Sequence, residues 1–247
     1  MKIFDAHFHI INPTFPLEEN QGYLPPAFTI DDYKKKTENM EVVGGAVVSG
    51  SFQGFDQTYL LHTLPKLGKG FCGVANIPFD STRNELEKLD NAGVTAVRFN
   101  LKRGGSESAD HLVTLSNKLF DEFGWHTELY VDSNDLSDLH QKLNQIPKFS
   151  IDHLGLTKAG LHDLYSWVEK GVKVKATGFG RIDFDPLPVL KQIYKINPNA
   201  LMFGTDLPST RAKTPFSMND IELISQNFDK AAREKIFYKN AFEWYNK

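Results

Sequence analysis

An alternation of short apolar segments with longer amphipathic ones, repeated about eight times, constrains the fold of this chain more than any other feature. The short segments are rich in β-branched and aromatic residues, which favour strands. They occupy residues 2–9, 43–50, 70–77, 95–101, 126–131, 149–155, 172–179 and 200–206. Strands that alternate with helices pair in parallel, and eight such units close into a barrel. We therefore expect an α/β protein, a distorted (β/α)8 TIM barrel with its active site at the C-terminal ends of the strands.

The length of 247 residues matches a complete barrel, and the chain shows no tandem repeat, low-complexity tract or linker. We expect a single domain over residues 1–247. Two of the amphipathic segments carry clear end signals. Ser81 is a candidate N-cap for a helix that stops at Gly93, and a second helix stops at Gly124.

The overall charge excludes several classes of partner. A net charge of -3 and a pI near 6.2 give no general attraction to nucleic acid or to an anionic membrane. An anionic small-molecule substrate must therefore be attracted locally. The single cysteine, Cys72, excludes an intramolecular disulfide and fits a reducing compartment, and its apolar neighbours indicate a buried, inert thiol. Without a secretory leader or membrane span, we expect a cytoplasmic protein.

The first predicted strand carries an unusual set of titratable groups in the stretch DAHFH. Residues two positions apart on a strand share a face. Asp5, His7 and His9 are therefore expected to point one way, while Ala6 and Phe8 point the other way. Three polar groups on one face of a buried strand predict a functional site.

Further polar residues fall at the ends of the other predicted strands. They are Ser49, Asn76, Arg98 with Asn100, Glu128 with Tyr130, His153, the segment from Thr177 to Arg181, and Asp206. Each residue alone is compatible with an ordinary structural role. In a barrel they all face one mouth, and this convergence favours an active site.

These residue types support two kinds of chemistry. His7, His9 and Asp206 offer two nitrogens and a carboxylate, which suit one divalent ion, Zn²⁺ or Mn²⁺, that holds a water in an open position. Without a metal, Asp206 can act as a general base while the histidines polarise a carbonyl. Arg98 and Arg181 suit a substrate carboxylate, and the alternative for each is a salt bridge to a neighbouring acid.

A long loop rich in proline and polar residues, from Ile11 to Thr29, follows the first strand directly. In a barrel this position lies at the C-terminal face, and long loops there are commonly lids or binding loops. We interpret it as an active-site loop. The alternative is a disordered surface excursion, but the apolar side chains of the loop predict that part of it packs: Phe15, Tyr23, Leu24 and Phe28.

Several motifs in order along the chain resemble the amidohydrolase superfamily, in its amidohydrolase-2 branch. They are FDAHFHI, VRFN, LYVDSNDL, IDHLG, GTDLP and the terminal AREKIFYKNAFEWY, and together they span nearly the whole sequence. Within that branch the chain is most similar to 2-pyrone-4,6-dicarboxylate lactonases, with L-fuconolactonase-type sugar lactonases nearby. The resemblance implies a barrel hydrolase acting on lactones or related acids.

The resemblance also implies roles for individual residues. Asp206 corresponds to the base that activates water. His7, His9 and His153 correspond to groups around the attacked carbonyl. The substrate contacts implied by the resemblance are Arg98, Tyr130 and Arg181, and we add Ser49 and Asn76 from the ends of strands two and three.

The chain departs from the binuclear members of this superfamily. Those enzymes hold two metals with a carboxylated lysine or glutamate at strand four and a histidine at strand five. Here Arg98 and Tyr130 stand on those strands, with Lys102 and Glu128 as the other candidates. The resemblance therefore implies at most one metal, and the pyrone lactonases work without a required metal.

We expect a hydrolase that opens a lactone or related cyclic ester of a carboxylate-bearing substrate, with water activated by Asp206. One alternative is a mononuclear Zn²⁺ or Mn²⁺ enzyme, either an amide or ester hydrolase or a non-oxidative decarboxylase of an unsaturated or aromatic acid. Another is a non-catalytic barrel, which the intact set of histidines and Asp206 argues against. A homo-oligomer is compatible with the terminal FEWYNK, which is either an interface or a capping helix.

Overall fold

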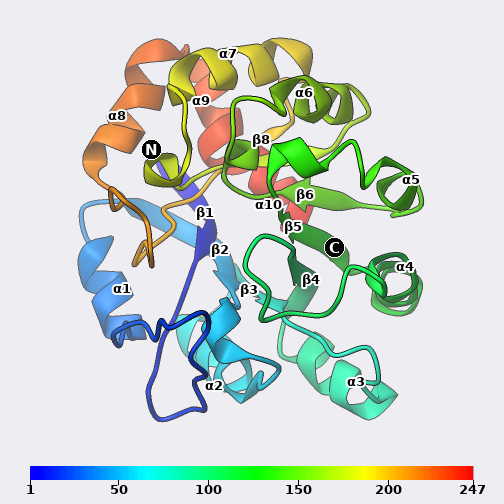
Figure 1. Ribbon diagram of the computed structural model, residues 1–247. Helices are drawn as coiled ribbons and strands as arrows, with labels where there is room; N and C mark the ends of the chain where they lie inside the picture. The colour runs from blue at the N-terminus through cyan, green and yellow to red at the C-terminus, as the bar shows by residue number, and fades with distance from the viewer. Residues whose placement is uncertain (247) are drawn as a thin grey trace.

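The computed structural model describes residues 1–246, and within them eight parallel strands form one sheet in sequence order. The strands curve into a barrel surrounded by helices, which confirms the predicted TIM barrel (Figure 1). The strands are β1 (Lys2–Phe8), β2 (Glu41–Val48), β3 (Phe71–Ala75), β4 (Val94–Asn100), β5 (His126–Tyr130), β6 (Phe149–Ile151), β7 (Lys173–Ala176) and β8 (Leu201–Phe203).

The outer layer consists of helices that follow the strands. They are α1 (Ile30–Lys36), α2 (Thr58–Leu67), α3 (Arg83–Asn91), α4 (Leu112–Phe123), α5 (His140–Leu143), α6 (Leu161–Glu169), α7 (Pro186–Ile196), α8 (Met218–Asn227), α9 (Lys230–Glu234) and α10 (Asn240–Tyr245). Short turns follow four strands: η1 (Ser51–Gln53), η2 (Ser133–Asp135), η3 (His153–Gly155) and η4 (Phe179–Arg181). A π-helical turn, η5 (Lys235–Lys239), joins α9 to α10. A membrane-crossing helix needs a long apolar run, and none of the helices in residues 1–246 has one.

The helix-end predictions were partly right. Gly124 ends α4 in a left-handed conformation, as predicted. At α3 the N-cap is Thr82 and not Ser81, because Thr82 forms a capping box with Glu85. Gly93 follows the C-cap of α3 with a φ of 100°, which only glycine adopts readily.

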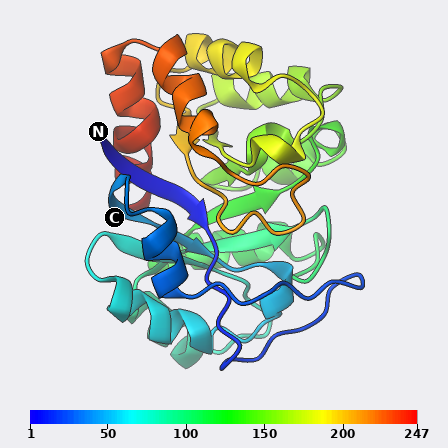
Figure 2. The ribbon, with the colours of Figure 1, turned by 90° about the vertical axis from the view of Figure 1, so that its left-hand side faces the viewer.

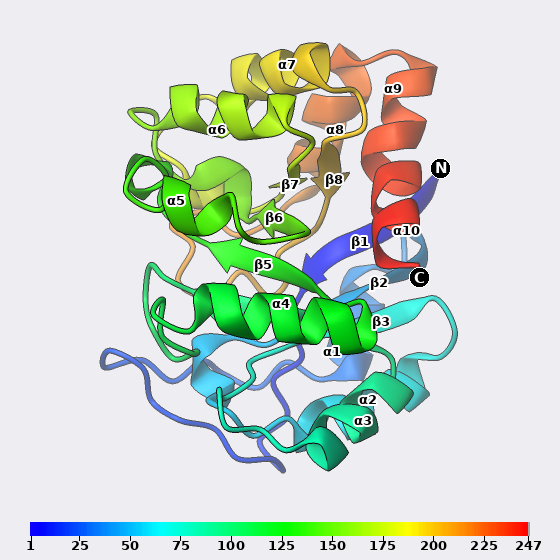
Figure 3. The same ribbon diagram turned by 90° about the vertical axis from the view of Figure 1, so that its right-hand side faces the viewer.

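The N-terminal end of the barrel is filled by a small apolar cluster and closed by α10. Phe4, Ala6 and Met202 belong to this cluster, and the Tyr245 ring stacks on Phe4 with centroids 5.4 Å apart. Figure 3 shows α10 lying beside β1. The terminal FEWY segment is therefore a capping helix, which was one of its two predicted roles. Cys72 lies in the same cluster, and burial raises the pKa of its thiol to about 12.

Contrary to the prediction, the side chains of the first strand do not alternate regularly between its two faces. Its pairing with β2 is irregular between Asp5 and Phe8, where the register shifts. Ala6 faces the barrel interior and Phe8 faces the helices, although regular alternation would place them on one face. The expectation that Asp5 shares a face with His7 and His9 was wrong, because the irregularity reverses the phase of the strand.

Asp5 instead joins the two ends of the barrel wall. Its carboxylate accepts hydrogen bonds from the Thr205 amide at 2.8 Å, the Thr205 hydroxyl at 2.7 Å and the Tyr33 hydroxyl of α1 at 3.0 Å. Backbone hydrogen bonds continue the seam, from the Asp206 amide to the His7 carbonyl and from the His9 amide to the Leu207 carbonyl, both at 2.7 Å. This seam holds His7 of β1 and His9, which follows β1, beside Asp206.

We expect Tyr33→Phe to lower the free energy of unfolding by about 1–3 kcal/mol, because it leaves a buried carboxylate with one donor fewer. The ring stacks on Phe8 with centroids 3.9 Å apart, and this packing is kept in the variant. Urea denaturation measures the change. The matched control is Tyr165→Phe on α6, which should change stability by less than about 0.5 kcal/mol. Equal stability losses in the two variants would contradict the role assigned to the hydroxyl.

Candidate active site

A column of buried charges crosses the barrel interior. The ammonium of Lys175 in β7 hydrogen-bonds to Glu128 of β5, and its Nζ lies 3.4 Å from Oδ1 of Asp152, which follows β6. Arg98 of β4 donates from Nη2 to Asp152 Oδ2 at 3.0 Å and from Nη1 to the Ser49 carbonyl at 2.8 Å. Neighbouring charges in the column alternate in sign, which is the arrangement that lets ions be buried.

A further pair lies at the mouth of the barrel, where Arg181 Nε donates to Asp206 Oδ2 at 2.7 Å. Both arginines therefore form the salt bridges that were the alternatives to substrate binding, and both still line the pocket described below.

Sequence reasoning missed Asp152 and Lys175. The signal for Lys175 was a lysine in an otherwise buried strand, and Asp152 stood next to His153 within IDHLG.

The three predicted histidines meet above this column. His7 Nδ1 lies 3.2 Å from Lys175 Nζ, and its Nε2 lies 3.9 Å from Asp206 Oδ1. His9 Nδ1 donates a hydrogen bond to the Val48 carbonyl at 2.7 Å, and its Nε2 lies 3.9 Å from the same Asp206 oxygen. The His153 ring contacts the His7 ring edge-on at 4.8 Å. The structure thus brings together the four residues predicted to be catalytic.

Burial sets the protonation of this cluster. It lowers the pKa of His7 and His153 well below the usual range and that of His9 to about 3, and the nearby arginines act in the same direction on His9 and His153. All three imidazoles are therefore neutral near pH 7. Burial raises the pKa of Asp206, and the Arg181 guanidinium partly offsets this effect.

The backbone at two of these residues is strained. Asp206 and His153 have φ values of 58° and 51°, in the left-handed region that costs energy for residues other than glycine. Gly178 makes room for His153, because a Cβ at this position would lie 2.4 Å from His153 Nδ1. Strain of this kind is characteristic of functional sites.

The pocket over the histidines is small and strongly basic. Its volume is about 30 Å³, and the residues that line it are His9, Gly50, Ser51, Phe52, Arg98, Asn100, Arg103, Tyr130, His153, Arg181, Thr210 and Arg211. Arg103 and Arg211 were not predicted, because they lie in loops beyond β4 and β8 that carry no strand pattern. Arg103 Nε lies 3.5 Å from the Tyr130 hydroxyl, so a strand-five tyrosine and a loop arginine share one wall.

Two predicted substrate contacts do not reach this pocket with their side chains. The Ser49 hydroxyl is hydrogen-bonded to Gln57 and Tyr59, at 2.6 and 2.7 Å. The Asn76 amide donates to the carbonyls of Gly50 and Gly54 at 3.1 Å. Both side chains hold loops in place instead.

The loop at residues 11–29 does reach the mouth of the barrel. Figure 2 shows it, in dark blue, projecting beyond the C-terminal end of β1. Arg211 donates a hydrogen bond to the Asn20 carbonyl and lies over the Tyr23 ring, 4.6 Å from its centroid. Gln21 donates to the Arg103 carbonyl at 3.1 Å. The tip of the loop therefore contacts two residues that line the pocket.

One group of atoms in the site suits a divalent ion. Ligand atoms of His7, His9 and Asp206 lie within 4.8 Å of one another, and two nitrogens with one carboxylate oxygen are a usual Zn²⁺ or Mn²⁺ donor set. Within residues 1–246, His7 Nε2 and Asp206 Oδ1 are buried without a hydrogen-bond partner. A second group, which includes His7 and Asp152, fits poorly because the Lys175 ammonium already contacts both of them.

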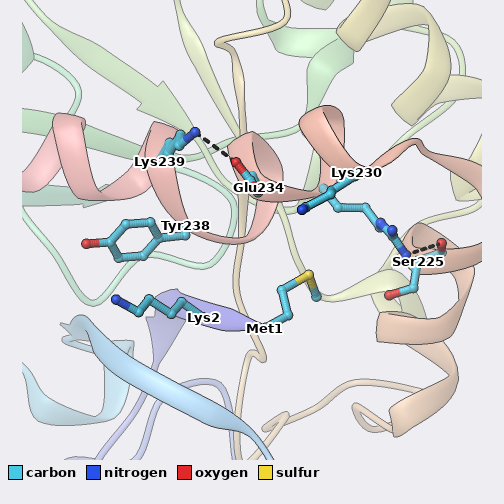
Figure 4. Close-up of a pocket in the computed structure, with 8 residues that line it drawn as sticks. Met1, Lys2, Ser225, Lys230, Glu234, Tyr238 and Lys239 are labelled. Carbon is cyan, nitrogen blue, oxygen red and sulfur yellow. Dashed lines mark hydrogen bonds and ion pairs between the residues drawn. The ribbon is translucent and has the colours of Figure 1, made fainter.

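A larger cavity of about 650 Å³ lies at the other end of the barrel, around the start of β1 (Figure 4). Its walls come from Met1, Lys2 and the α8–η5 segment. Lys239 is paired with Glu234, and Arg233 donates to the Ser225 carbonyl. The buried histidines and acids lie at the opposite end, so the smaller pocket is the candidate active site.

Comparison with known proteins agrees with this fold. The family model for amidohydrolases matches residues 4–247. A 2-pyrone-4,6-dicarboxylate hydrolase of Comamonas testosteroni is 23% identical over 237 residues, covering 85% of this chain and 77% of the relative. Among solved structures, a protein of Agrobacterium tumefaciens has a TM-score of 0.85 at 19% identity, covering 98% of this chain and 95% of that one. A probable 2-pyrone-4,6-dicarboxylic acid hydrolase of Acinetobacter baumannii, with citric acid bound, has a TM-score of 0.84 at 23% identity, covering 99% of both chains.

A barrel with acid and histidine side chains at its strand ends is thus found in a chain that the family model matches almost completely. The chain belongs to the amidohydrolase family and is a hydrolytic enzyme. This finding excludes the alternative that the protein is a non-catalytic barrel.

The buried histidines should make the fold sensitive to acid. Burial lowers the pKa of His126 to about 4, and His7, His9 and His153 are shifted in the same direction. Unfolded histidines bind protons below about pH 6.5, whereas these do not in the folded state. The free energy of unfolding should therefore fall as the pH is lowered from about 7 to about 5, by up to about 1.4 kcal/mol per pH unit for each histidine.

Asp5 acts in the opposite direction, because burial raises its pKa to about 6 and the folded state takes up its proton first. We expect His126→Gln to reduce the pH dependence of the free energy of unfolding by the contribution of about one proton. Urea denaturation between pH 5 and 7 measures this change. His162→Gln, at an exposed position on α6, is the control and should leave the slope unchanged. A slope that His126→Gln does not alter would contradict the assignment.

Proposed function

We propose that this enzyme hydrolyses a lactone, or a related cyclic ester, that carries at least one carboxylate. The observation that carries the proposal is the environment of Asp206. One of its oxygens is held by Arg181, and the other faces His7 and His9 without a hydrogen-bond partner in residues 1–246. A carboxylate whose pKa is raised by burial, with one unpartnered oxygen beside His9 in the wall of the pocket, is suited to take a proton from water.

The reaction follows from this arrangement. Asp206 Oδ1 accepts a proton from a water molecule as the water oxygen adds to the lactone carbonyl carbon. Negative charge develops on the carbonyl oxygen, where hydrogen-bond donors from the surrounding imidazoles and guanidinium groups stabilise it. The ring carbon–oxygen bond then breaks and the ring oxygen takes up the proton. The product is the open-chain hydroxy acid or its tautomer.

The arginines support a carboxylate-bearing substrate. Arg98 and Arg181 flank the floor of the pocket, and Arg103 and Arg211 stand at its mouth. Asp152 and Asp206 already neutralise Arg98 and Arg181, whereas Arg103 and Arg211 form no salt bridge within residues 1–246. Guanidinium groups bind carboxylates through paired hydrogen bonds, so these two cations suit a substrate carboxylate. The names of the similar proteins from Comamonas testosteroni and Acinetobacter baumannii, which specify a pyrone dicarboxylate, support an unsaturated ring with two carboxylates as the substrate class.

A second candidate function is a mononuclear metal enzyme, either an amide or ester hydrolase or a non-oxidative decarboxylase. The donor set formed by His7, His9 and Asp206 favours it. A divalent ion bound there would polarise a substrate carbonyl and lower the pKa of a bound water. In this case a chelator should abolish turnover, and the matching metal should restore it.

Asp206→Asn should lower kcat for lactone hydrolysis by about 10²- to 10⁴-fold, because the amide cannot accept the proton from water. Substrate affinity, measured by calorimetry on the inactive variant, should change only a few-fold. Asp163→Asn on the outer helix α6 is the matched control and should retain full turnover. Undiminished turnover in Asp206→Asn would exclude the proposed base.

Arg211→Met should weaken recognition of the substrate carboxylate. We expect kcat/KM for a carboxylate-bearing lactone to fall about tenfold or more, while kcat/KM for an uncharged lactone of the same ring size changes little. Lys213→Met, two residues away and exposed, is the control. If both lactones lose equal efficiency in Arg211→Met, this arginine has a structural role only.

A further inference from the structure

Lys175 lies deeper in the barrel than the reacting groups, and its ammonium is completely enclosed. Its side chain is 0% exposed, and three potential acceptors surround Nζ. These are a carboxylate oxygen of Glu128, Oδ1 of Asp152 at 3.4 Å and Nδ1 of His7 at 3.2 Å. An ammonium can only donate hydrogen bonds; its contacts with Glu128 and His7 Nδ1 have hydrogen-bond geometry, whereas Asp152 Oδ1 forms an ion pair with it only.

The contact between the Lys175 ammonium and Nδ1 determines which nitrogen of His7 carries the proton. A neutral imidazole has one N–H and one lone pair. If Nδ1 carried the proton, it would point at the ammonium and leave one Lys175 donor buried without an acceptor. If Nδ1 is the lone pair, it accepts this Lys175 donor, and the contact at 3.2 Å is a hydrogen bond. The proton of His7 then lies on Nε2, the nitrogen that faces Asp206 Oδ1 across 3.9 Å.

The other possible partner of Nδ1 is weaker. Asp152 Oδ1 lies 3.5 Å from it and has no hydrogen-bond partner within residues 1–246, whereas the Lys175 contact is shorter and has hydrogen-bond geometry. The other oxygen of Asp152 is already held by Arg98 at 3.0 Å. The ammonium is therefore the better partner for Nδ1.

We propose that Lys175 is a positioning residue that fixes His7 in the tautomer protonated at Nε2. This inference rests on the proposed function, and it makes His7 a hydrogen-bond donor to the carbonyl oxygen under attack. A nitrogen that carries a proton has no lone pair for a metal. The His7, His9 and Asp206 group then lacks one of its three ligands, and catalysis proceeds with side chains alone.

The tautomer can be observed directly. In protein labelled with ¹⁵N-histidine, two-bond proton–nitrogen correlation spectra distinguish an Nε2–H from an Nδ1–H imidazole, and a His7→Gln spectrum assigns the His7 signals. We expect the Nε2–H pattern in the native enzyme and the Nδ1–H pattern in Lys175→Met, where Asp152 becomes the remaining partner of Nδ1. An Nδ1–H pattern in the native enzyme, or an unchanged pattern in Lys175→Met, would overturn the proposal.

Metal binding gives an independent readout. After incubation with Zn²⁺ and gel filtration, the native enzyme should retain less than about a tenth of an equivalent by elemental analysis, because His7 lacks a free lone pair at Nε2. Lys175→Met should retain about one equivalent. Lys102→Met, at a half-exposed lysine paired with Asp132, is the control and should behave as the native enzyme does. Stoichiometric Zn²⁺ in the native enzyme would overturn the proposal.

Removing one buried cation leaves two carboxylates less well compensated, so Lys175→Met alone can fail to fold. The double variant Lys175→Met with Glu128→Gln removes one charge of each sign and keeps the column balanced, and both readouts apply to it unchanged. Neither readout depends on activity. Undiminished lactone turnover in Asp206→Asn would defeat the proposed function, whereas an Nδ1–H signal in an active enzyme would defeat only the role of Lys175.

Discussion

The need to neutralise ions inside the barrel governs the arrangement of this active site. An isolated charge cannot be buried in an apolar interior, and the buried carboxylates of Glu128, Asp152 and Asp206 each lie against a cation. The partners come from different strands: Arg98 of β4 pairs with Asp152 after β6, and Lys175 of β7 pairs with Glu128 of β5. Such pairs contribute little net stability compared with apolar residues of similar size. Their contribution is geometric, because each pair fixes the distance between strands that carry site residues.

The seam between β1 and β8 has a second geometric effect. Within residues 1–246 these strands form no regular ladder, and the barrel closes through the Asp5 carboxylate and two backbone hydrogen bonds beyond β8. An irregular seam tolerates the register shift in β1 and the left-handed backbone at Asp206. These two distortions turn His7 and His9 toward the Asp206 carboxylate. The irregular seam of the barrel wall therefore holds the residues proposed to react.

The fold was predictable from the sequence because eight short apolar segments remain recognisable as strands, although polar residues stand at their ends. The site was partly predictable: His7, His9, His153 and Asp206 stand at strand ends, and a barrel brings strand ends together. The face of Asp5 was not predictable, since a register shift in one strand leaves no signature in residue type. Arg103 and Arg211 were missed because loop positions depend on contacts between distant segments, such as the docking of residues 20–23 on Arg211.

The arginines at the mouth connect substrate recognition with the loop. Burial lowers the pKa of Arg211, and the nearby charge of Arg103 adds to this effect, so the two guanidinium groups repel each other at a mouth with little free volume. Without an anion, Arg211 is held by the Asn20 carbonyl and the Tyr23 ring. A carboxylate between the arginines would relieve their repulsion and compete with the loop for Arg211. On the proposed function, an anionic substrate would therefore compete with Asn20 and Tyr23 for Arg211, whereas an uncharged ligand would leave these contacts in place.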